Sequence, residues 1–377
     1  MSFRLRRAAT ALSLDDDDDN SKGDDDRNEL EMSCDIGETT FRKGRLAITI
    51  SFFCDRFGVI TLSGFLTTEC PTAKACAKSC PIRPRKSTLD CLVDVTRLDR
   101  VSLVGRGCSG SVVKAIDRET QTLYAIKTVN NVYDKAQRHQ ILTEIQTLYS
   151  VRTPWLIDFY GAFFKDHALS LVLEFCDMGS LDSLVRLAGP IPERILACMT
   201  FQILSGLQHL KDARHFHRDI KPQNILVTSH GRVKLTDFGL ARELLGTLDM
   251  AKTFVGTFKY MSPERIQNQP YDFSSDIWSL GLVLVECATG AYPYSACRSY
   301  IDVRVVQSII ESPAPTLPTD EFSVDFQDVV VDCLRKDPYD RATADVLLYS
   351  PWLERHDATD GPRCVETIRK WLATLNL

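Results

Sequence analysis

The sequence predicts an α+β fold in which β-strands come first and α-helices follow. Apolar residues alternate on both sides of a glycine-rich turn within residues 101–113, which is typical of two strands joined by a tight connection. Residues 141–151 and 365–375 instead carry apolar side chains at helical spacing. The chain has 377 residues, 44% hydrophobic and 25% charged, which suits one soluble domain of about 260 residues with tails.

The glycine-rich turn indicates a loop that binds phosphate. Gly105, Gly107 and Gly110 form a G-x-G-x-x-G pattern, and Val112 follows it. The pattern alone is weak, but here it joins two strands, whereas a dinucleotide-binding fold places a helix after the turn. Glycine lets backbone amides approach phosphate oxygens because no Cβ stands in the way.

Residues 215–239 carry the strongest chemical signal in the chain. A His-Arg-Asp motif ends at Asp219 and is followed by Lys221 and Asn224, and an Asp-Phe-Gly motif begins at Asp237. Phosphoryl transfer needs positioning and charge neutralisation more than covalent chemistry, and two acids, an amide and a lysine can supply both. Carboxylate and amide oxygens are also ligands that Mg²⁺ prefers.

This stretch resembles the catalytic and metal-binding loops of protein kinases. The resemblance implies a bilobal fold, with a small β-rich N-lobe (98–175) that includes helix αC and a larger, mainly α-helical C-lobe (176–353). It implies ATP and Mg²⁺ as cofactors. In the catalytic roles, Asp219 would accept the proton of the substrate hydroxyl and Lys221 would steady the γ-phosphate. The metal ligands would be Asn224 and Asp237.

The resemblance also implies an ATP site between the lobes. Lys127 would contact the α- and β-phosphates and pair with Glu144 on helix αC. Val112, Ala125 and Leu226 would sandwich adenine. The full set expected around the nucleotide is Val104, Gly105, Arg106, Gly107, Cys108, Ser109, Gly110, Val112, Ala125, Lys127, Glu174, Cys176 and Leu226, with the backbone at Glu174 and Cys176 bonding the adenine edge.

Other kinase-like positions have structural roles. Glu264, in the sequence YMSPERI, would form a buried ion pair with Arg341. Asp276 would hold the backbone of the catalytic loop. An apolar column that couples helix αC to the metal loop would consist of Leu148, Phe238 and His217.

Within the kinases, the chain resembles the dual-specificity MAP kinase kinases. The segments LVLEFCDMGSLD, FVGTFKYMSPERI and YDFSSDIWSLGLVLVECATGAYPY carry this resemblance, and residues 311–338 are similar to the plant-type branch in particular. It covers residues 98–353 and implies that the substrate is the activation loop of a MAP kinase, modified on Thr and Tyr. The alternatives are another kinase of the same group, such as a MAP kinase kinase kinase, and a pseudokinase scaffold, which the intact catalytic residues disfavour.

The segment after the Asp-Phe-Gly motif resembles an activation loop. Thr247 and Thr253 have five residues between them, the spacing of phosphoacceptors in the plant-type branch. Asp249 stands where animal and fungal members carry their first acceptor, so it places a fixed negative charge there. Arg218 is a fixed cation beside the catalytic aspartate, and a phosphate on the loop would pair with it. Thr257 would support the catalytic residues.

The N-terminal segment 1–44 is expected to be a disordered, aspartate-rich tail, because its composition cannot bury enough apolar surface. Arg6, Arg7, Leu12 and Leu14 resemble the peptide with which this family docks its downstream MAP kinase: two cations face an acidic groove and two apolar side chains fill pockets. A transit peptide and a tail without function are the alternatives. An upstream MAP kinase kinase kinase is the other expected partner.

The remaining segments are less informative. Residues 45–97 are expected to form a pre-kinase segment with a linker rich in Cys, Pro and Lys. Residues 354–377 would form a tail with an amphipathic helix, either packed on the C-lobe or exposed as a docking surface. The spacing of the 13 cysteines does not suit a zinc site, and a small-hydrophobe role is favoured over oxidation for Cys108 and Cys176.

The net charge of −5 gives no electrostatic reason for nucleic-acid binding. The sequence has no secretory signal and no apolar run that approaches the roughly 18 residues of a membrane span. We therefore expect a protein of the cytoplasm, and the nucleus stays open as a second location.

Overall fold

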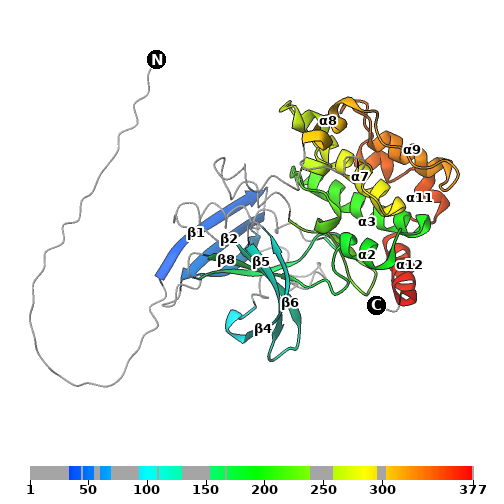
Figure 1. Ribbon diagram of the computed structural model, residues 1–377. Helices are drawn as coiled ribbons and strands as arrows, with labels where there is room; N and C mark the ends of the chain where they lie inside the picture. The colour runs from blue at the N-terminus through cyan, green and yellow to red at the C-terminus, as the bar shows by residue number, and fades with distance from the viewer. Residues whose placement is uncertain are drawn as a thin grey trace, which may run out of the picture.

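Most strands lie in one part of the structure, a computed structural model, and the described helices lie in another (Figure 1). The structure describes residues 34–43, 46–54, 60–68, 93–107, 110–129, 153–165, 168–237, 258–294 and 303–375. A β-rich lobe comes first and a mainly helical lobe follows, so the predicted α+β, bilobal architecture is confirmed. Among the described helices, none has the length and apolar character needed to cross a lipid bilayer.

The N-lobe contains a five-stranded antiparallel sheet with the order β4-β5-β6-β8-β7. Tyr124 and Ile126 lie two residues apart on the same face of β6, and both are buried in a small apolar core. This core also contains Ala115, Phe163 and Val172. The two strands predicted before and after residues 108 and 109 are present as β4 and β5. The strands are β4 (Leu98–Gly107), β5 (Gly110–Asp117), β6 (Leu123–Val129), β7 (Phe159–Lys165) and β8 (Ala168–Glu174).

A second antiparallel sheet precedes the kinase-like region. It consists of β1 (Cys34–Lys43), β2 (Leu46–Cys54) and β3 (Ile60–Thr68), and β3 lies beside β7. The prediction of a disordered tail up to residue 44 is therefore corrected for the residues of β1. Pairing with β2, whose sequence is rich in β-branched and aromatic residues, satisfies the backbone of β1 and offsets its ordering cost.

The C-lobe is built around helix α7 (Ser274–Thr289), which is apolar on almost every side and packs against α3 and α9. A helix that is buried all round forms the centre of a domain and cannot move independently of it. The other helices in the described residues are α2 (Leu181–Ala188), α3 (Glu193–Asp212), α6 (Pro263–Ile266), α8 (Val303–Glu311), α9 (Val324–Cys333), α10 (Ala344–Leu347), α11 (Pro351–Arg355) and α12 (Gly361–Thr374).

The amphipathic pattern near the C-terminus corresponds to helix α12, which packs beside α3 (Figure 1). Ile368 and Leu372 of the predicted apolar stripe are buried, and Cys364 is buried with them. This contact supports the interpretation of the segment as a helix packed on the C-lobe. Whether its exposed face also docks a partner stays a prediction.

Helix α12 also contacts the turn between β9 (Ile225–Val227) and β10 (Val233–Leu235). Gly231 in this turn has φ of +83°, and a Cβ there would lie 2.1 Å from the carbonyl oxygen of Val365. Gln202 of α3 holds the same turn, since it donates to the Gly231 carbonyl and accepts from the Val233 amide.

We predict that Gly231→Ala lowers the unfolding temperature more than Gly179→Ala does. Both glycines have φ above +70°, so each alanine meets a backbone cost of about 1–2 kcal/mol. The nearest contact of a Cβ at Gly179 is an ordinary 3.6 Å, whereas Gly231 must also displace backbone of α12. Thermal unfolding of both variants measures the difference, and equal shifts would contradict a close approach of α12.

Candidate active site

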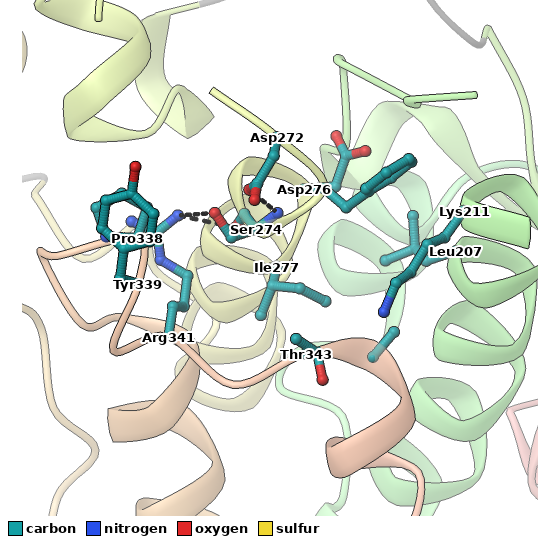
Figure 2. Close-up of a pocket in the computed structure, with 12 residues that line it drawn as sticks. Leu207, Lys211, Asp272, Ser274, Asp276, Ile277, Pro338, Tyr339, Arg341 and Thr343 are labelled. Carbon is teal, nitrogen blue, oxygen red and sulfur yellow. Dashed lines mark hydrogen bonds between the residues drawn. The ribbon is translucent and has the colours of Figure 1, made fainter. Parts of the chain in front are cut away.

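The catalytic loop is held by the buried helix α7. The carboxylate of Asp276, in the first turn of α7, accepts hydrogen bonds from the backbone N–H of His217 and of Arg218, each at 2.9 Å. The predicted role of Asp276 is therefore confirmed. Figure 2 shows Asp276 beside Asp272 and Ser274, where α7 begins. A negative charge in the first turn is also favoured by the helix dipole.

Arg218 adopts a left-handed backbone with φ of +67°. This conformation costs a residue with a side chain about 1–2 kcal/mol. Its N–H donates to Asp276, and its carbonyl accepts a hydrogen bond of 2.9 Å from Arg265 Nη1. The loop is thus fixed on both sides of Arg218, and sequence reasoning missed the contribution of Arg265.

Two donors converge on the carboxylate of Asp219. Lys221 Nζ lies 2.7 Å from Oδ2, and Asn224 Nδ2 lies 2.7 Å from the same oxygen and 2.8 Å from the Asp219 carbonyl. The turn that contains Asn224 is closed by a 2.9 Å bond from its N–H to the Lys221 carbonyl. The structure therefore brings the three predicted residues of this loop together, and neither donor occupies the second oxygen, Oδ1.

Asp237 and Lys127 form an ion pair between the lobes. Lys127 Nζ, on β6, lies 2.5 Å from Asp237 Oδ1. Burial would raise the pKa of Asp237, but the ammonium of Lys127 outweighs it and holds this pKa below its usual range. The Thr236 amide donates to the Asn224 carbonyl at 3.0 Å, which places the metal loop beside the catalytic loop. The predicted partner of Lys127, Glu144, lies outside the described residues.

The register of the sheet aligns the predicted phosphate-binding residues. Gly105 on β4 faces Val112 on β5, and Val112 faces Lys127 on β6. Ala125 lies two residues before Lys127 on the same strand and so on the same face. Leu226, on β9, belongs to the C-lobe and packs against its core.

Cys176, at the predicted adenine edge, is buried. Burial, together with the charge of Glu174, raises the pKa of its thiol to about 12. The thiol is therefore protonated at neutral pH, which favours the small-hydrophobe interpretation over oxidation.

The donor set suits Mg²⁺. Asp237 offers a carboxylate, and because Nδ2 of Asn224 donates to Asp219, the amide oxygen of Asn224 stays available as a ligand. No cluster of three or more His, Cys, Asp or Glu that could hold a metal occurs among the described residues. Two protein oxygens fit Mg²⁺, because this ion usually takes one or two protein ligands together with phosphate oxygens and water.

The predicted ion pair between Glu264 and Arg341 is confirmed and is almost fully buried. Two parallel hydrogen bonds of 3.0 and 3.1 Å join the guanidinium to the carboxylate. Burial would raise the pKa of Glu264, but its bonds with Arg341 hold it low. Arg341 also donates to Ser274, and both line a hollow of about 210 Å³ at the start of α7 (Figure 2).

Sequence reasoning also missed Lys234. It sits between two apolar residues of β10, and the lysine is buried and paired with Glu174. A charge in the middle of a short apolar strand was the available signal. Other predicted residues lie outside the described part of the chain: Arg6, Arg7, Leu12, Leu14, Cys108, Ser109, Leu148, Phe238, Thr247, Asp249, Thr253 and Thr257.

We predict that acid destabilises the protein partly through His217. The ring is fully buried, and burial lowers its pKa below the ordinary value of 6.5. Below pH 6.5 the unfolded state binds a proton that the native state does not, so stability falls as pH falls, by up to about 1.4 kcal/mol per pH unit.

His217→Phe should therefore show a smaller decrease of unfolding temperature between pH 7.5 and 5.5 than the unmodified protein. The comparison concerns the slope against pH, so a constant loss of stability in the variant does not affect it. Identical slopes would show that His217 does not carry this pH dependence.

Comparisons with known proteins agree with this geometry. A family model described as the protein kinase domain matches residues 98–353. The mitogen-activated protein kinase kinase SIPKK of Nicotiana tabacum is 39% identical over 285 residues, 74% of this chain and 78% of the relative. Mitogen-activated protein kinase kinase 3 of Arabidopsis thaliana is 42% identical over 258 residues, 67% of this chain, which spans about half (49%) of that relative.

A third relative comes from an animal. The dual specificity mitogen-activated protein kinase kinase dSOR1 of Drosophila melanogaster is 38% identical over 282 residues, 68% of this chain and 71% of the relative. The domain match, the plant relatives and the bilobal fold lead to one conclusion. The chain belongs to the protein kinase family, as a phosphotransferase of the plant-type MAP kinase kinase group.

Proposed function

We propose that this kinase transfers the γ-phosphoryl group of ATP to Thr and Tyr in the activation loop of a MAP kinase. The observation that carries the proposal is the convergence of Lys221 and Asn224 on the Asp219 carboxylate, with Asp237 held by Lys127 nearby. This set of groups suits in-line phosphoryl transfer, which depends on positioning and charge neutralisation.

In the proposed mechanism, ATP supplies the phosphoryl group, and Mg²⁺, when bound, would offset its negative charge. Asp219 accepts the proton of the substrate hydroxyl, whose oxygen bonds to the γ-phosphorus as the bond to ADP breaks. Lys221 stays between Asp219 and the γ-phosphate. Asn224 and Asp237 would hold Mg²⁺, and Lys127 would contact the α- and β-phosphates. His217 would remain buried and neutral beneath the catalytic loop, because burial lowers the pKa of its ring.

The choice of substrate rests on the resemblance to MAP kinase kinases. Relatives of that name match 74% and 68% of this chain, and the fruit-fly relative is named a dual specificity enzyme. A MAP kinase as the downstream partner and a MAP kinase kinase kinase as the upstream partner follow from the same resemblance. A kinase of another branch would phosphorylate serines and threonines of unrelated proteins instead.

Regulation by phosphorylation of Thr247 and Thr253 is part of the proposal. A phosphothreonine carries about −1.5 to −2 charges at neutral pH and can accept several hydrogen bonds from an arginine. Arg218 stands beside Asp219 in a backbone that Asp276 and Arg265 already fix. A loop phosphate on Arg218 would therefore dock against a rigid support.

The first prediction of this proposal concerns substrate sites. Protein carrying Thr247→Glu and Thr253→Glu, with Mg-ATP, should phosphorylate both Thr and Tyr of a catalytically dead MAP kinase with a Thr-x-Tyr loop. A generic basic protein should receive little phosphate. Mass spectrometry of the two substrates identifies the modified residues.

The same protein with Asp219→Asn added is the control, and it should lose both products while retaining ATP binding. Phosphate only on serines and threonines of the generic protein would show protein kinase activity but would assign the chain to another branch of the kinases. ATP binding without any phosphate transfer would instead support a pseudokinase scaffold.

The second prediction concerns docking. If the basic and apolar side chains near the N-terminus bind the MAP kinase, Arg6→Ala/Arg7→Ala/Leu12→Ala should weaken its capture in a pull-down by at least about tenfold. Phosphorylation of a short peptide copied from the activation loop should not change, because such a peptide lacks the docking groove. Retention of the MAP kinase at the unmodified level would refute the docking interpretation.

A further inference from the structure

Lys234 is a buried cation behind the proposed nucleotide site. It lies in β10, three residues before Asp237, and 3% of its side chain is exposed. A lysine is almost never buried to this extent unless it is paired, because removing the charge from water is costly. The contacts of Lys234 therefore show which parts of the fold require it.

The ammonium of Lys234 joins two segments outside its own strand. Nζ lies 2.6 Å from Glu174 Oε2, 3.2 Å from the Leu156 carbonyl and 3.8 Å from Asp158 Oδ2. Glu174 ends β8, and residues 156–158 lead into β7. Lys234 itself belongs to the C-lobe, so these contacts connect the lobes.

The acidic partners are fixed to one another as well. The Glu174 amide donates to the Asp158 carbonyl at 2.9 Å, and the Asp158 amide donates to Glu174 Oε2 at 3.2 Å. On the other side, the Ile157 amide donates to the Leu235 carbonyl at 3.0 Å. Backbone and side-chain bonds thus form one network that leaves little freedom for movement between β8 and β10.

The two ends of this network carry different parts of the proposed ATP site. The backbone of Glu174 would bond the adenine edge, and β10 leads directly to Asp237, a proposed Mg²⁺ ligand. A nucleotide that reaches both must match the distance between them. An error of about 1 Å in such a distance weakens binding and catalysis considerably.

We propose that Lys234 is a positioning residue for the nucleotide, because it fixes the spacing between the adenine-binding hinge at Glu174 and the metal loop at Asp237. The inference rests on the ATP site proposed above. If it holds, a ligand that contacts both the hinge and the metal loop needs the network for tight binding. A ligand that contacts the hinge alone does not. Linked contacts strengthen each other only while their spacing matches the ligand.

The test compares two ligands of the full-length protein by calorimetry. In Lys234→Met, which keeps an unbranched side chain one atom shorter and removes the charge, the Kd of a non-hydrolysable Mg-ATP analogue should rise about tenfold and that of adenosine less than about twofold. In kinetics, KM for ATP should rise about as much, while KM for the protein substrate stays unchanged.

Removing the Lys234 charge leaves the Glu174 carboxylate without its cation, which lowers stability. A second variant therefore separates the effect on stability from the effect on nucleotide positioning. Lys234→Met/Glu174→Gln removes both charges and should recover unfolding temperature without recovering affinity for the Mg-ATP analogue. The backbone groups of residue 174 remain in this variant. Lys211→Met is the matched control, since Lys211 pairs with Asp345 at the surface within the C-lobe, and it should change neither affinity.

Each other outcome overturns the inference. Equal losses for adenosine and the Mg-ATP analogue would mean that Lys234 supports the hinge alone. Positioning would also be contradicted if Lys234→Met left the affinities for both ligands unchanged. The same holds if the double variant recovered affinity for the Mg-ATP analogue, or if turnover rose in Lys234→Met. If the unmodified protein fails to bind the Mg-ATP analogue, the proposed function itself fails, a result distinct from all of these.

Discussion

The pair of hydrogen bonds from the backbone of His217 and Arg218 to Asp276 is the constraint on which the active site depends. It attaches the catalytic loop to α7, a helix buried on nearly every side. The start of that helix is fixed in turn, because Arg341 donates to the Ser274 carbonyl while it pairs with Glu264. Removing one partner of such a pair leaves the other charge buried and uncompensated, at a cost of about 3–5 kcal/mol. The catalytic loop is therefore fixed to the most buried helix of the C-lobe.

Charge compensation organises the site itself. Asp219 and Asp237 would repel each other and the phosphates if they stood alone, but each contacts a lysine, Lys221 and Lys127 respectively. Under the proposed function, Mg-ATP would bring a cation for Asp237 and phosphate oxygens for Lys127, while Lys221 stays beside Asp219. Asp237 and Lys127 would then each exchange one charged partner for another of the same sign, so the site would be arranged for these charges before the ligand arrives.

The sequence predicts this chemistry well where residues act through short, fixed spacings. Asp219, Lys221 and Asn224 lie within six residues, and Gly105, Val112 and Lys127 become neighbours through simple hairpin pairing. Lys234 and Arg265 were missed because their partners are distant in sequence, so no local spacing reveals them. The strand β1 was missed because composition predicts disorder, whereas pairing with β2 decides the outcome.

The C-terminal helix α12 contacts the turn that precedes the strand leading to the metal loop. Helix α12 packs on α3 and closes against Gly231, in the turn that leads into β10 and so to Asp237. Gln202 of α3 bonds both sides of that turn. A side chain at position 231 would have to displace either the helix or the turn. The glycine is therefore required by a contact with residue 365, more than a hundred residues away, and the position of the metal loop depends in part on how the C-terminal helix packs.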